Sequence, residues 1–316
     1  MPIAAPAPGF LVACMNPVIQ KTLVFDRYTA DEVNRCAEHR VDASGKGVNV
    51  ARVLAQTGRR AVQLTQAGGN TRDWFLSLCA QDGLEMAWVE SGSEIRFCYT
   101  VIDRSAGTAT ELVEEGRQVA PGTAELLLAE LDRLLPSCGT LIVSGTKAAG
   151  FPDSLVPEMV RRAIAAGHLV VLDIKGTDLL ASLQHRPAVV KPNLHELLAT
   201  WPLAGTAALG RADNGQPQEG ALRAHVETLA GRLHAGHGSS LVVTRGHRPT
   251  WYWDDGALRE EPVTERAAVN PTGSGDSFTA GLAAVLAEGG TMRDAVREGS
   301  RLGGLNAERL KPGSVI

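Results

Sequence analysis

Residues 270–281 read NPTGSGDSFTAG, a glycine-rich turn that leads into a predicted amphipathic helix. Gly273 and Gly275 allow a tight turn, so the amides of residues 273–276 would point outward at the helix N-terminus. Unpaired amides and the helix dipole both favour a bound anion at this end. Asp276 lies in the middle of the turn, where a carboxylate either caps the helix or takes a proton from a hydroxyl that attacks a bound phosphate. The stretch is not a dinucleotide-binding fingerprint, because Phe278 replaces the third glycine.

Two more segments combine polar side chains with predicted helix starts. Residues 44–49 read SGKGVN and open a helix predicted over 47–58, with Lys46 beside the exposed amides. The alternative is a plain glycine-rich turn before a surface helix, and the pattern of a P-loop is absent from the sequence. Residues 191–196 read KPNLHE. Here Asn193 and Glu196 can hold water around Mg²⁺, form a capping box, or do both.

Short apolar runs alternate with helical patterns along the chain, which predicts an α/β fold with a parallel sheet covered on both faces. The predicted strands are 10–14, 61–65, 140–143, 169–172, 189–190 and 241–244, and the predicted helices are 47–58, 73–80, 125–135, 277–287 and 292–309. Two stretches, 18–41 and 95–113, break this rhythm, and the second alternates like a β-hairpin. They predict a small sheet that serves as a lid or a dimer face, or else an edge extension of the main sheet. Residues 204–220 are rich in glycine and polar residues and predict a mobile loop.

The composition limits the possible partners. The chain has 316 residues, a length that fits about two domains or one large α/β domain. Its formal net charge of −4 argues against nucleic acid as a main partner. Its five cysteines form no C-x-x-C pair, so neither a disulfide framework nor a zinc site is expected. The N-terminal residues lack the pattern of a signal peptide, and no apolar run is long enough to span a membrane. A cytoplasmic protein is therefore expected.

Taken together, the motifs GKGVNVARVLAQTG, KPNLHEL and PTGSGDSFTAG resemble the ribokinase-like fold and specifically the PfkB family of carbohydrate kinases. Asn16-Pro17 and Val33-Asn34-Arg35 resemble its hexose-phosphate branch, which includes 1-phosphofructokinases and tagatose-6-phosphate kinases. The resemblance implies a single domain over residues 1–316, built as a three-layer α/β/α sandwich with a mostly parallel sheet. It also implies a β-sheet lid from about 16–42 and about 88–113, through which a homodimer forms.

The resemblance also implies roles for individual residues. Asp276 matches the catalytic base of the family. The family's anion hole, which steadies the transferring phosphoryl group, corresponds here to Gly273, Ser274 and Gly275. The positions matching contacts to the sugar or its phosphate are Gln20, Arg35, Gly45, Lys46, Asn49 and Arg96. The positions matching contacts to the nucleotide are Lys191, Asn193, Glu196, Thr244, Gly246 and Asn306, with Asn193 and Glu196 also ordering Mg²⁺ through water. The implied cofactors are ATP and Mg²⁺.

Several positions depart from the branch. Gln20 replaces an aspartate expected to bind sugar hydroxyls, which removes a negative charge from the sugar site. The other departures are Ser44, Ser274, Asn270-Pro271, Lys147, Arg245 and Arg248. The expected activity is ATP-dependent phosphorylation of a phosphorylated ketohexose, fructose-1-phosphate or tagatose-6-phosphate. The alternatives are a kinase for an unphosphorylated sugar or polyol, which the loss of the aspartate favours, and a sugar-phosphate-binding regulator without turnover.

Overall fold

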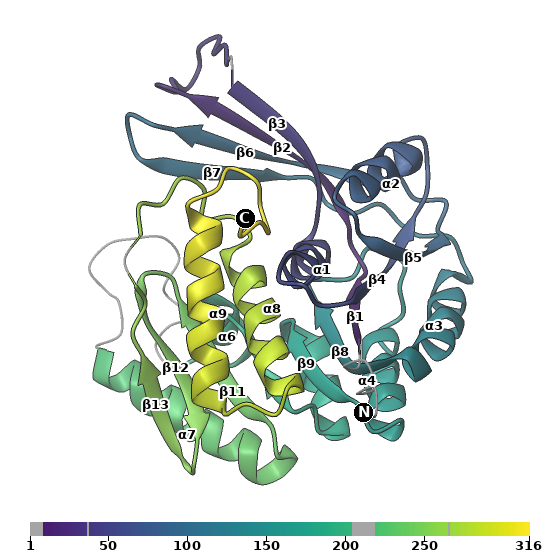
Figure 1. Cartoon of the computed structure of the whole chain (residues 1–316), viewed down its shortest axis with the longest axis vertical. Helices are drawn as coiled ribbons and strands as arrows, with labels where there is room; N and C mark the ends of the chain where they lie inside the picture. Colours follow the sequence, from purple (N-terminus) through teal and green to yellow (C-terminus); the bar gives the residue numbers. More distant parts are fainter. Residues whose placement is uncertain (1–8, 37, 204–218, 265) are drawn as a thin grey trace, which may run out of the picture.

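The computed structural model describes residues 9–36, 38–203, 219–264 and 266–316. Its main sheet has nine strands in the order β13-β12-β11-β10-β9-β8-β1-β4-β5 (Figure 1). These strands are β1 (Gly9–Cys14), β4 (Ala61–Ala67), β5 (Glu85–Glu90), β8 (Cys138–Ser144), β9 (Leu169–Asp173), β10 (Val189–Val190), β11 (Ser240–Arg245), β12 (Arg248–Asp254) and β13 (Ala257–Glu261). In this spatial order, each neighbouring pair of strands between β11 and β5 is parallel. At the other edge, β12 pairs antiparallel with β11, and β13 pairs antiparallel with β12.

Helices cover both faces of this sheet, because alternate strand residues point to opposite sides. On β1, Leu11 and Ala13 join one apolar cluster and Phe10 and Val12 join the other. The first cluster includes residues of α3 (Thr123–Leu134), α4 (Leu155–Ala165), α5 (Gly176–Ser182), α6 (Leu194–Thr200) and α7 (Glu219–His237), together with the short 3₁₀ turns Leu135–Ser137 and Leu183–His185. The second includes residues of α1 (Lys46–Gln56), α8 (Ser274–Ala287) and α9 (Met292–Ala307). This confirms the predicted three-layer α/β/α arrangement.

A separate four-stranded sheet stands at one end of the molecule, at the top of Figure 1. Its order is β3-β2-β6-β7, formed by β2 (Val18–Phe25), β3 (Glu38–Ser44), β6 (Arg96–Asp103) and β7 (Thr108–Val113). β2 pairs in parallel with β6, and each of the two has an antiparallel outer neighbour. A third apolar cluster joins α2 (Arg72–Gln81) to the base of this sheet through Phe75 and Ile19.

The structure decides between the two alternatives for the stretches 18–41 and 95–113. Both form a sheet of their own, so they are not an edge extension of the main sheet. Within the lid implied over about 88–113, the small sheet itself begins at Arg96, and β5 pairs with β4 through Glu90 in the main sheet. The loop predicted over 204–220 lies almost entirely outside the described residues.

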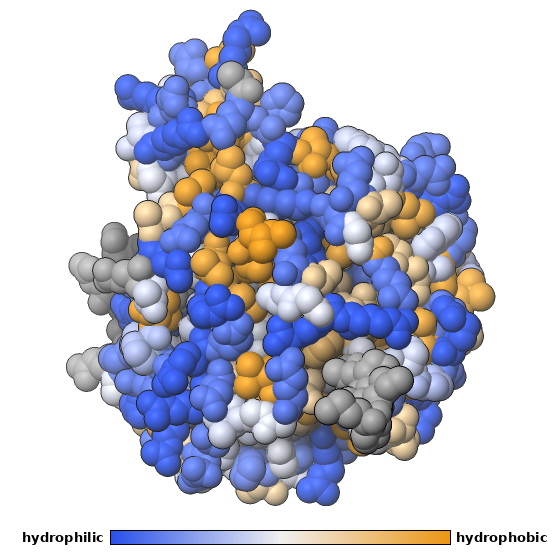
Figure 2. Space-filling model, viewed as in Figure 1, coloured by the Kyte–Doolittle hydropathy of each residue, from blue (hydrophilic) through white to orange (hydrophobic). Residues whose placement is uncertain are grey.

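The face drawn in Figure 2 is mostly hydrophilic, with smaller hydrophobic areas between the charged side chains. Within the described part of the chain, no helix combines the length and the apolar character that a membrane span requires.

Candidate active site

The glycine-rich turn that precedes α8 is held by its backbone conformation and by a buried amide. Gly273 is the N-cap residue, and its φ of 86° lies in the left-handed region. A Cβ atom at this position would lie 2.4 Å from the amide nitrogen of Gly313, so only glycine fits. Asn306 donates from Nδ2 to the carbonyl oxygen of Thr272 at 2.9 Å and to Ser274 Oγ at 3.1 Å. The turn is therefore fixed before any ligand binds.

The amides of this turn are largely free. Ser274 N donates to the carbonyl oxygen of Pro271 at 3.1 Å. The amides of Gly273, Gly275 and Asp276 have no acceptor among the described residues. Gly275 is exposed, and a Cβ atom there would meet nothing. Free amides at the start of a helix of 14 residues form a site that attracts an anion.

Asp276 follows these amides and is buried, with 6% of its surface exposed. Burial raises its pKa from an ordinary 3.8 to about 6, against the opposing effects of Lys46, the Asn49 hydrogen bond and Lys191, while Asp173 adds to the rise. Asn49 donates from Nδ2 to Asp276 Oδ2 at 2.8 Å. A carboxyl group with this pKa can both accept and return a proton near neutral pH.

Lys46 connects three acidic groups at the start of α1. Its Nζ atom donates to Glu196 Oε1 at 2.8 Å and to Asp173 Oδ1 at 3.4 Å. Burial opposes the charge of Lys46, but Asp173, Glu196 and Asp276 outweigh it and raise the pKa of the ammonium group. Lys46 is therefore a permanent positive charge among these carboxylates.

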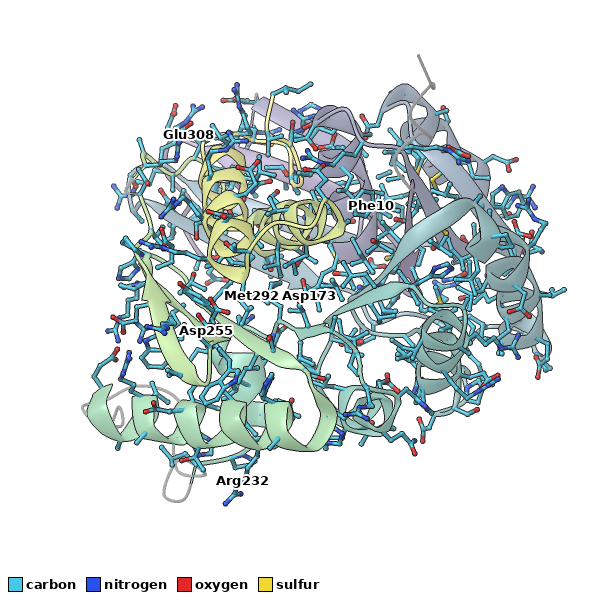
Figure 3. All side chains as sticks on the ribbon, turned by 60° about the horizontal axis from the view of Figure 1, so that its bottom comes forward. Phe10, Asp173, Arg232, Asp255, Met292 and Glu308 are labelled. Carbon is cyan, nitrogen blue, oxygen red and sulfur yellow. The ribbon has the colours of Figure 1, made fainter. Side chains whose placement is uncertain are left out.

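Asp173, the last residue of β9, is the main site residue that sequence reasoning missed. It is 1% exposed and lies deep in the molecule (Figure 3). Lys191 Nζ lies 3.4 Å from Asp173 Oδ2, and Thr279 Oγ1 donates to the same oxygen at 2.9 Å. Burial alone would raise the pKa of Asp173, but Lys191 and Lys46 outweigh it and hold it below its usual range. The signal in the sequence is an aspartate directly after the apolar run 169–172, at the carboxyl end of a parallel strand.

The start of α6 forms a complete capping box, which confirms that prediction. Glu196 N donates to Asn193 Oδ1 at 2.8 Å, and Asn193 N donates to Glu196 Oε2 at 3.0 Å. Asn193 also forms a parallel bridge with Thr244 at the end of β11. The cap and the bridge orient Glu196 toward Lys46. Ordering of Mg²⁺ by this pair stays a prediction.

A pocket of about 150 Å³ lies at the carboxyl ends of β1, β8 and β9. Cationic, anionic and neutral polar groups share it, and its lining is Cys14, Asn16, Lys46, Arg96, Gly145, Thr146, Asp173, Ile174, Lys175 and Glu196. Arg96 reaches it from the small sheet and donates to the carbonyl oxygen of Glu114 at 2.8 Å. Lys175 is exposed and has no ion-pair partner among the described residues, and no sequence motif indicated it.

Other predicted sugar contacts take different places. Gln20 is buried on β2 and donates from Nε2 to Thr100 Oγ1 at 2.9 Å, within the small sheet. Gly45 adopts a φ of 112° and packs its Cα beside Cys14, which lets α1 start directly against β1. Arg35 is exposed in the loop between β2 and β3 and does not line the pocket of its own chain.

Of the predicted nucleotide positions, Glu196 lines the pocket, whereas the lining does not include Lys191, Asn193, Thr244, Gly246 or Asn306. Gly246 forms the exposed turn between β11 and β12 with a φ of 66°. Asn306 is fully buried, and besides its two donated bonds it accepts one from Ser314 N at 3.2 Å. The side chain of Asn306 is thus committed to holding the glycine-rich turn and the C-terminal segment.

Several solved structures share this architecture. Phosphofructokinase-2 from Escherichia coli in complex with fructose-6-phosphate superposes with a TM-score of 0.80 at 22% identity, covering 97% of this chain and 96% of that one. A Thermotoga maritima protein described as a possible 1-phosphofructokinase gives a TM-score of 0.81 at 18% identity, covering 96% and 92%. Ribokinase from Thermotoga maritima gives 0.71 at 19% identity, covering 98% and 96%. These similarities confirm the predicted ribokinase-like fold.

The sequence profile of the pfkB family carbohydrate kinases matches residues 13–315, nearly the whole chain. The match includes the glycine-rich turn, Asp276, Lys46 and the capping box of α6. The chain belongs to the PfkB family of carbohydrate kinases, and it is a phosphotransferase.

Proposed function

We propose that this kinase transfers a phosphoryl group from ATP to a hydroxyl of a phosphorylated ketohexose, with fructose-1-phosphate or tagatose-6-phosphate as acceptor. The observation that carries the proposal is the buried carboxyl group of Asp276, with a pKa of about 6, directly after the free amides of Gly273 and Gly275. A base and an anion site are thereby joined in one turn.

In this proposal Asp276 takes the proton of the attacking hydroxyl. Its Oδ2 atom accepts from Asn49, so Oδ1 is the oxygen available for that proton. The amides of Gly273, Gly275 and Asp276 stabilise the negative charge of the transferring group, and they need no reorganisation because the turn is preformed. Ser274 contributes through the turn, since its own amide already donates to Pro271. Positioning and charge stabilisation of this kind account for most of phosphoryl-transfer catalysis.

ATP and Mg²⁺ fit the carboxylates of the site. Mg²⁺ is usually held by one or two carboxylates together with substrate phosphates and water. Asp173 and Glu196 provide two carboxylates in one pocket, and both already bind Lys46. We therefore assign them, with Asn193, to holding the hydrated ion, which would neutralise charge on the donor phosphates. Lys191, Thr244, Gly246 and Asn306 are assigned to the nucleotide side on the family resemblance.

The cations of the pocket support an anionic acceptor. Arg96 and Lys175 line the pocket without a carboxylate partner among the described residues, and arginine pairs well with phosphate. Fructose-6-phosphate, which is bound in the structure of the Escherichia coli relative, is also a ketohexose phosphate. The neutral amide of Gln20, already bonded to Thr100, is what favours an unphosphorylated sugar or polyol as the second candidate acceptor.

The test is ADP release with ATP, Mg²⁺ and a panel of acceptors. The panel is fructose-1-phosphate, tagatose-6-phosphate, fructose-6-phosphate, free fructose, ribose and sorbitol. We expect kcat/KM at least about 100-fold higher for a ketohexose phosphate than for any neutral acceptor, because an arginine–phosphate contact is lost in the latter. Turnover on a neutral acceptor alone would refute the phosphorylated substrate class, and sugar-phosphate binding without ADP release would support the regulator instead.

We also propose a homodimer through the small sheet. On its edge strand β7, Leu112 and Val113 are 55% and 53% exposed, an unusual exposure for two adjacent apolar residues. Arg35 in the β2–β3 loop lies outside its own pocket, which is consistent with a contact to a second copy. Sedimentation of the wild type and of Leu112→Lys tests this, and we expect a dimer that the substitution dissociates.

A further inference from the structure

Arg52 is a buried cation that lies one helical turn after Asn49 on α1. It is 1% exposed, and it belongs to none of the roles implied by the family resemblance. Its NH1 group donates to Asn49 Oδ1 at 2.9 Å and to the carbonyl oxygen of Pro312 at 2.9 Å. Its Nε donates to Asp82 Oδ2 at 2.8 Å, and NH2 donates to the carbonyl oxygen of Ala43. Burying a guanidinium group requires this many acceptors.

The contact with Arg52 decides which way the Asn49 amide points. An arginine only donates hydrogen bonds, and an ionised carboxylate only accepts them. The atom of Asn49 that faces Arg52 must therefore be Oδ1, and Ser44 Oγ donates to the same oxygen at 3.0 Å. This leaves Nδ2 facing Asp276, where it donates to Oδ2. A reversed amide would place an oxygen against the carboxylate and an N–H₂ group against the guanidinium.

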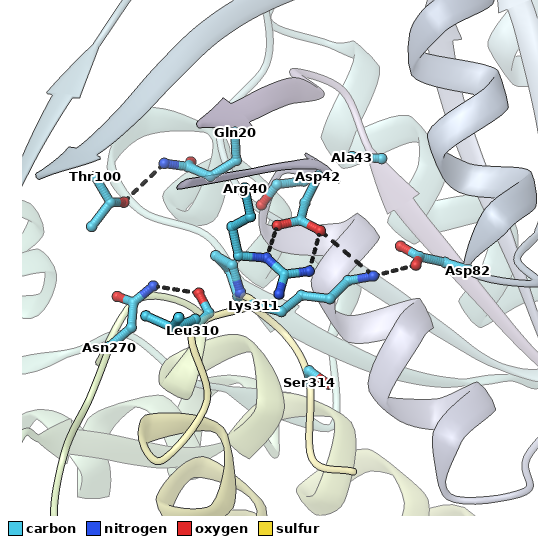
Figure 4. Close-up of polar contacts among 12 residues, drawn as sticks. Gln20, Arg40, Asp42, Ala43, Asp82, Thr100, Asn270, Leu310, Lys311 and Ser314 are labelled. Atoms are coloured by element: carbon cyan, nitrogen blue, oxygen red, sulfur yellow. Dashed lines mark hydrogen bonds and ion pairs between the residues drawn. The ribbon is translucent and has the colours of Figure 1, made fainter. Parts of the chain in front are cut away.

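The outer side of Arg52 is anchored by an ionic cluster that joins three parts of the chain. Asp82, at the end of α2, accepts from both Arg52 and Lys311. Lys311 also lies 3.6 Å from Asp42 of β3, which pairs with Arg40 at 2.6 Å (Figure 4). The guanidinium is thus also held by Asp82 and by the carbonyl oxygens of Ala43 and Pro312, so it cannot follow Asn49 if that amide turns.

We propose that Arg52 is a positioning residue for phosphoryl transfer: it fixes the Asn49 amide so that Nδ2 holds Asp276 Oδ2 and leaves Oδ1 free for the acceptor hydroxyl. The inference rests on the proposed role of Asp276 as base. Misplacement of a reacting group by about 1 Å can cost roughly 100-fold in rate. The charged groups facing Asp276 are Lys46, Lys191 and Asp173, and none of them can replace the constraint on Asn49.

The experiment compares Arg52→Met with Gln56→Ala. Gln56 lies one turn further along α1 and holds the C-terminal segment through Ser314 and the amide of Val315, without touching Asn49. It therefore controls for any effect of Arg52 that acts only through Pro312. Steady-state kinetics are measured with the best acceptor, and the carboxyl titration of Asp276 is followed by ¹³C NMR without substrate.

For Arg52→Met we expect kcat to fall about 10- to 100-fold, acceptor KM to change less than about threefold, and the Asp276 titration to move to higher pH. Gln56→Ala should stay within about threefold of wild type with an unmoved titration. A folded Arg52→Met enzyme with near wild-type kcat, or an equal loss in Gln56→Ala, would overturn the proposal.

If Arg52→Met does not fold cooperatively, Arg52→Lys replaces it, because lysine keeps the buried positive charge beside Asp82 but lacks the planar fork that reaches Asn49 Oδ1 and the Pro312 carbonyl oxygen together. We expect a smaller loss in kcat, about 3- to 10-fold, with a titration shift in the same direction; unchanged values for both would overturn the proposal. Because the titration needs no acceptor, it tests Arg52 even if the wild type turns over no ketohexose phosphate. The proposed substrate class then fails separately.

Discussion

Lys46 Nζ lies 2.8 Å from Glu196 Oε1 and 3.4 Å from Asp173 Oδ1, so one ammonium group joins the start of α1 to the start of α6 and the end of β9. Both carboxylates are largely buried, and each would be unfavourable without a cation. The same charge acts on Asp276, where Lys46 is the strongest influence opposing the effect of burial on its pKa. Lys46 therefore favours the ionised form of Asp276 and, together with Lys191, that of Asp173.

Lys46→Met should remove this stabilisation of the ionised carboxylates. We expect kcat/KM at pH 7 to fall at least about 100-fold, because Asp276 becomes more protonated and two carboxylates lose their partner. The matched control is Lys147→Met, since Lys147 pairs with Asp153 and Asp178 outside the pocket lining. Steady-state assays from pH 5.5 to 9 are the measurement. Equal losses in the two variants would contradict a specific role for Lys46.

The glycine-rich turn, the start of α1 and the α6 capping box could be predicted because each is a local pattern of backbone preference and helix capping. The position of Asp173 at a strand end carries a signal in the sequence, but its pairing does not, because its partners Lys46 and Thr279 are 127 and 106 residues away. The hydrogen bond from Gln20 to Thr100 could not be predicted either, because it joins residues 80 apart in the sequence and depends on the register of β2 against β6. Sequence patterns describe single elements, whereas the electrostatics of the site arise between elements.

The pH dependence of the reaction follows from the raised pKa of Asp276. The base is active when ionised, so kcat/KM should increase with pH and level off above about 6, where the carboxylate predominates. Below this value the rate should fall about tenfold per pH unit. The measurement is a pH profile between 4.5 and 8.5 with fructose-1-phosphate. A profile that stays flat down to pH 5 would show that Asp276 is not the titrating base.

Asp276→Asn should lose activity and gain stability. Loss of the base costs about 100- to 10,000-fold in kcat. The pKa of Asp276 in the folded protein is raised from 3.8 to about 6. The protonated carboxyl group therefore contributes to the free energy of unfolding below pH 4, and this contribution is lost as the pH rises through 6. Above pH 6 the buried charge costs up to ~3 kcal/mol at 1.36 kcal/mol per pKa unit. The amide should therefore raise the free energy of unfolding at pH 8 but not at pH 4.

Urea denaturation at the two pH values measures this difference. The control is Asp153→Asn, because the exposed carboxylate of Asp153 has a pKa lowered by Lys147, so its removal brings no gain at pH 8. An Asp276→Asn protein that is less stable than wild type at pH 8 would mean that the ionised carboxylate is favourably paired in the fold.

Arg96 offers a separate test of the acceptor, because the small sheet carries cations on both of its faces. Register pairs Val18 with Arg96 and Lys21 with Tyr99, and alternation along the strands puts Arg96 and Lys21 on opposite faces. Arg96 lines the pocket, whereas Lys21 Nζ lies 4.8 Å from the ring centre of Phe97.

We expect Arg96→Met to raise the KM for a ketohexose phosphate about 10- to 100-fold and to leave the KM for ATP unchanged. Lys21→Met, which removes an equal charge from the other face, should change neither constant. If Arg96→Met raises the KM for ATP instead, Arg96 belongs to the donor side and the acceptor phosphate must be held by other groups, of which Lys175 is the exposed cation in the same pocket.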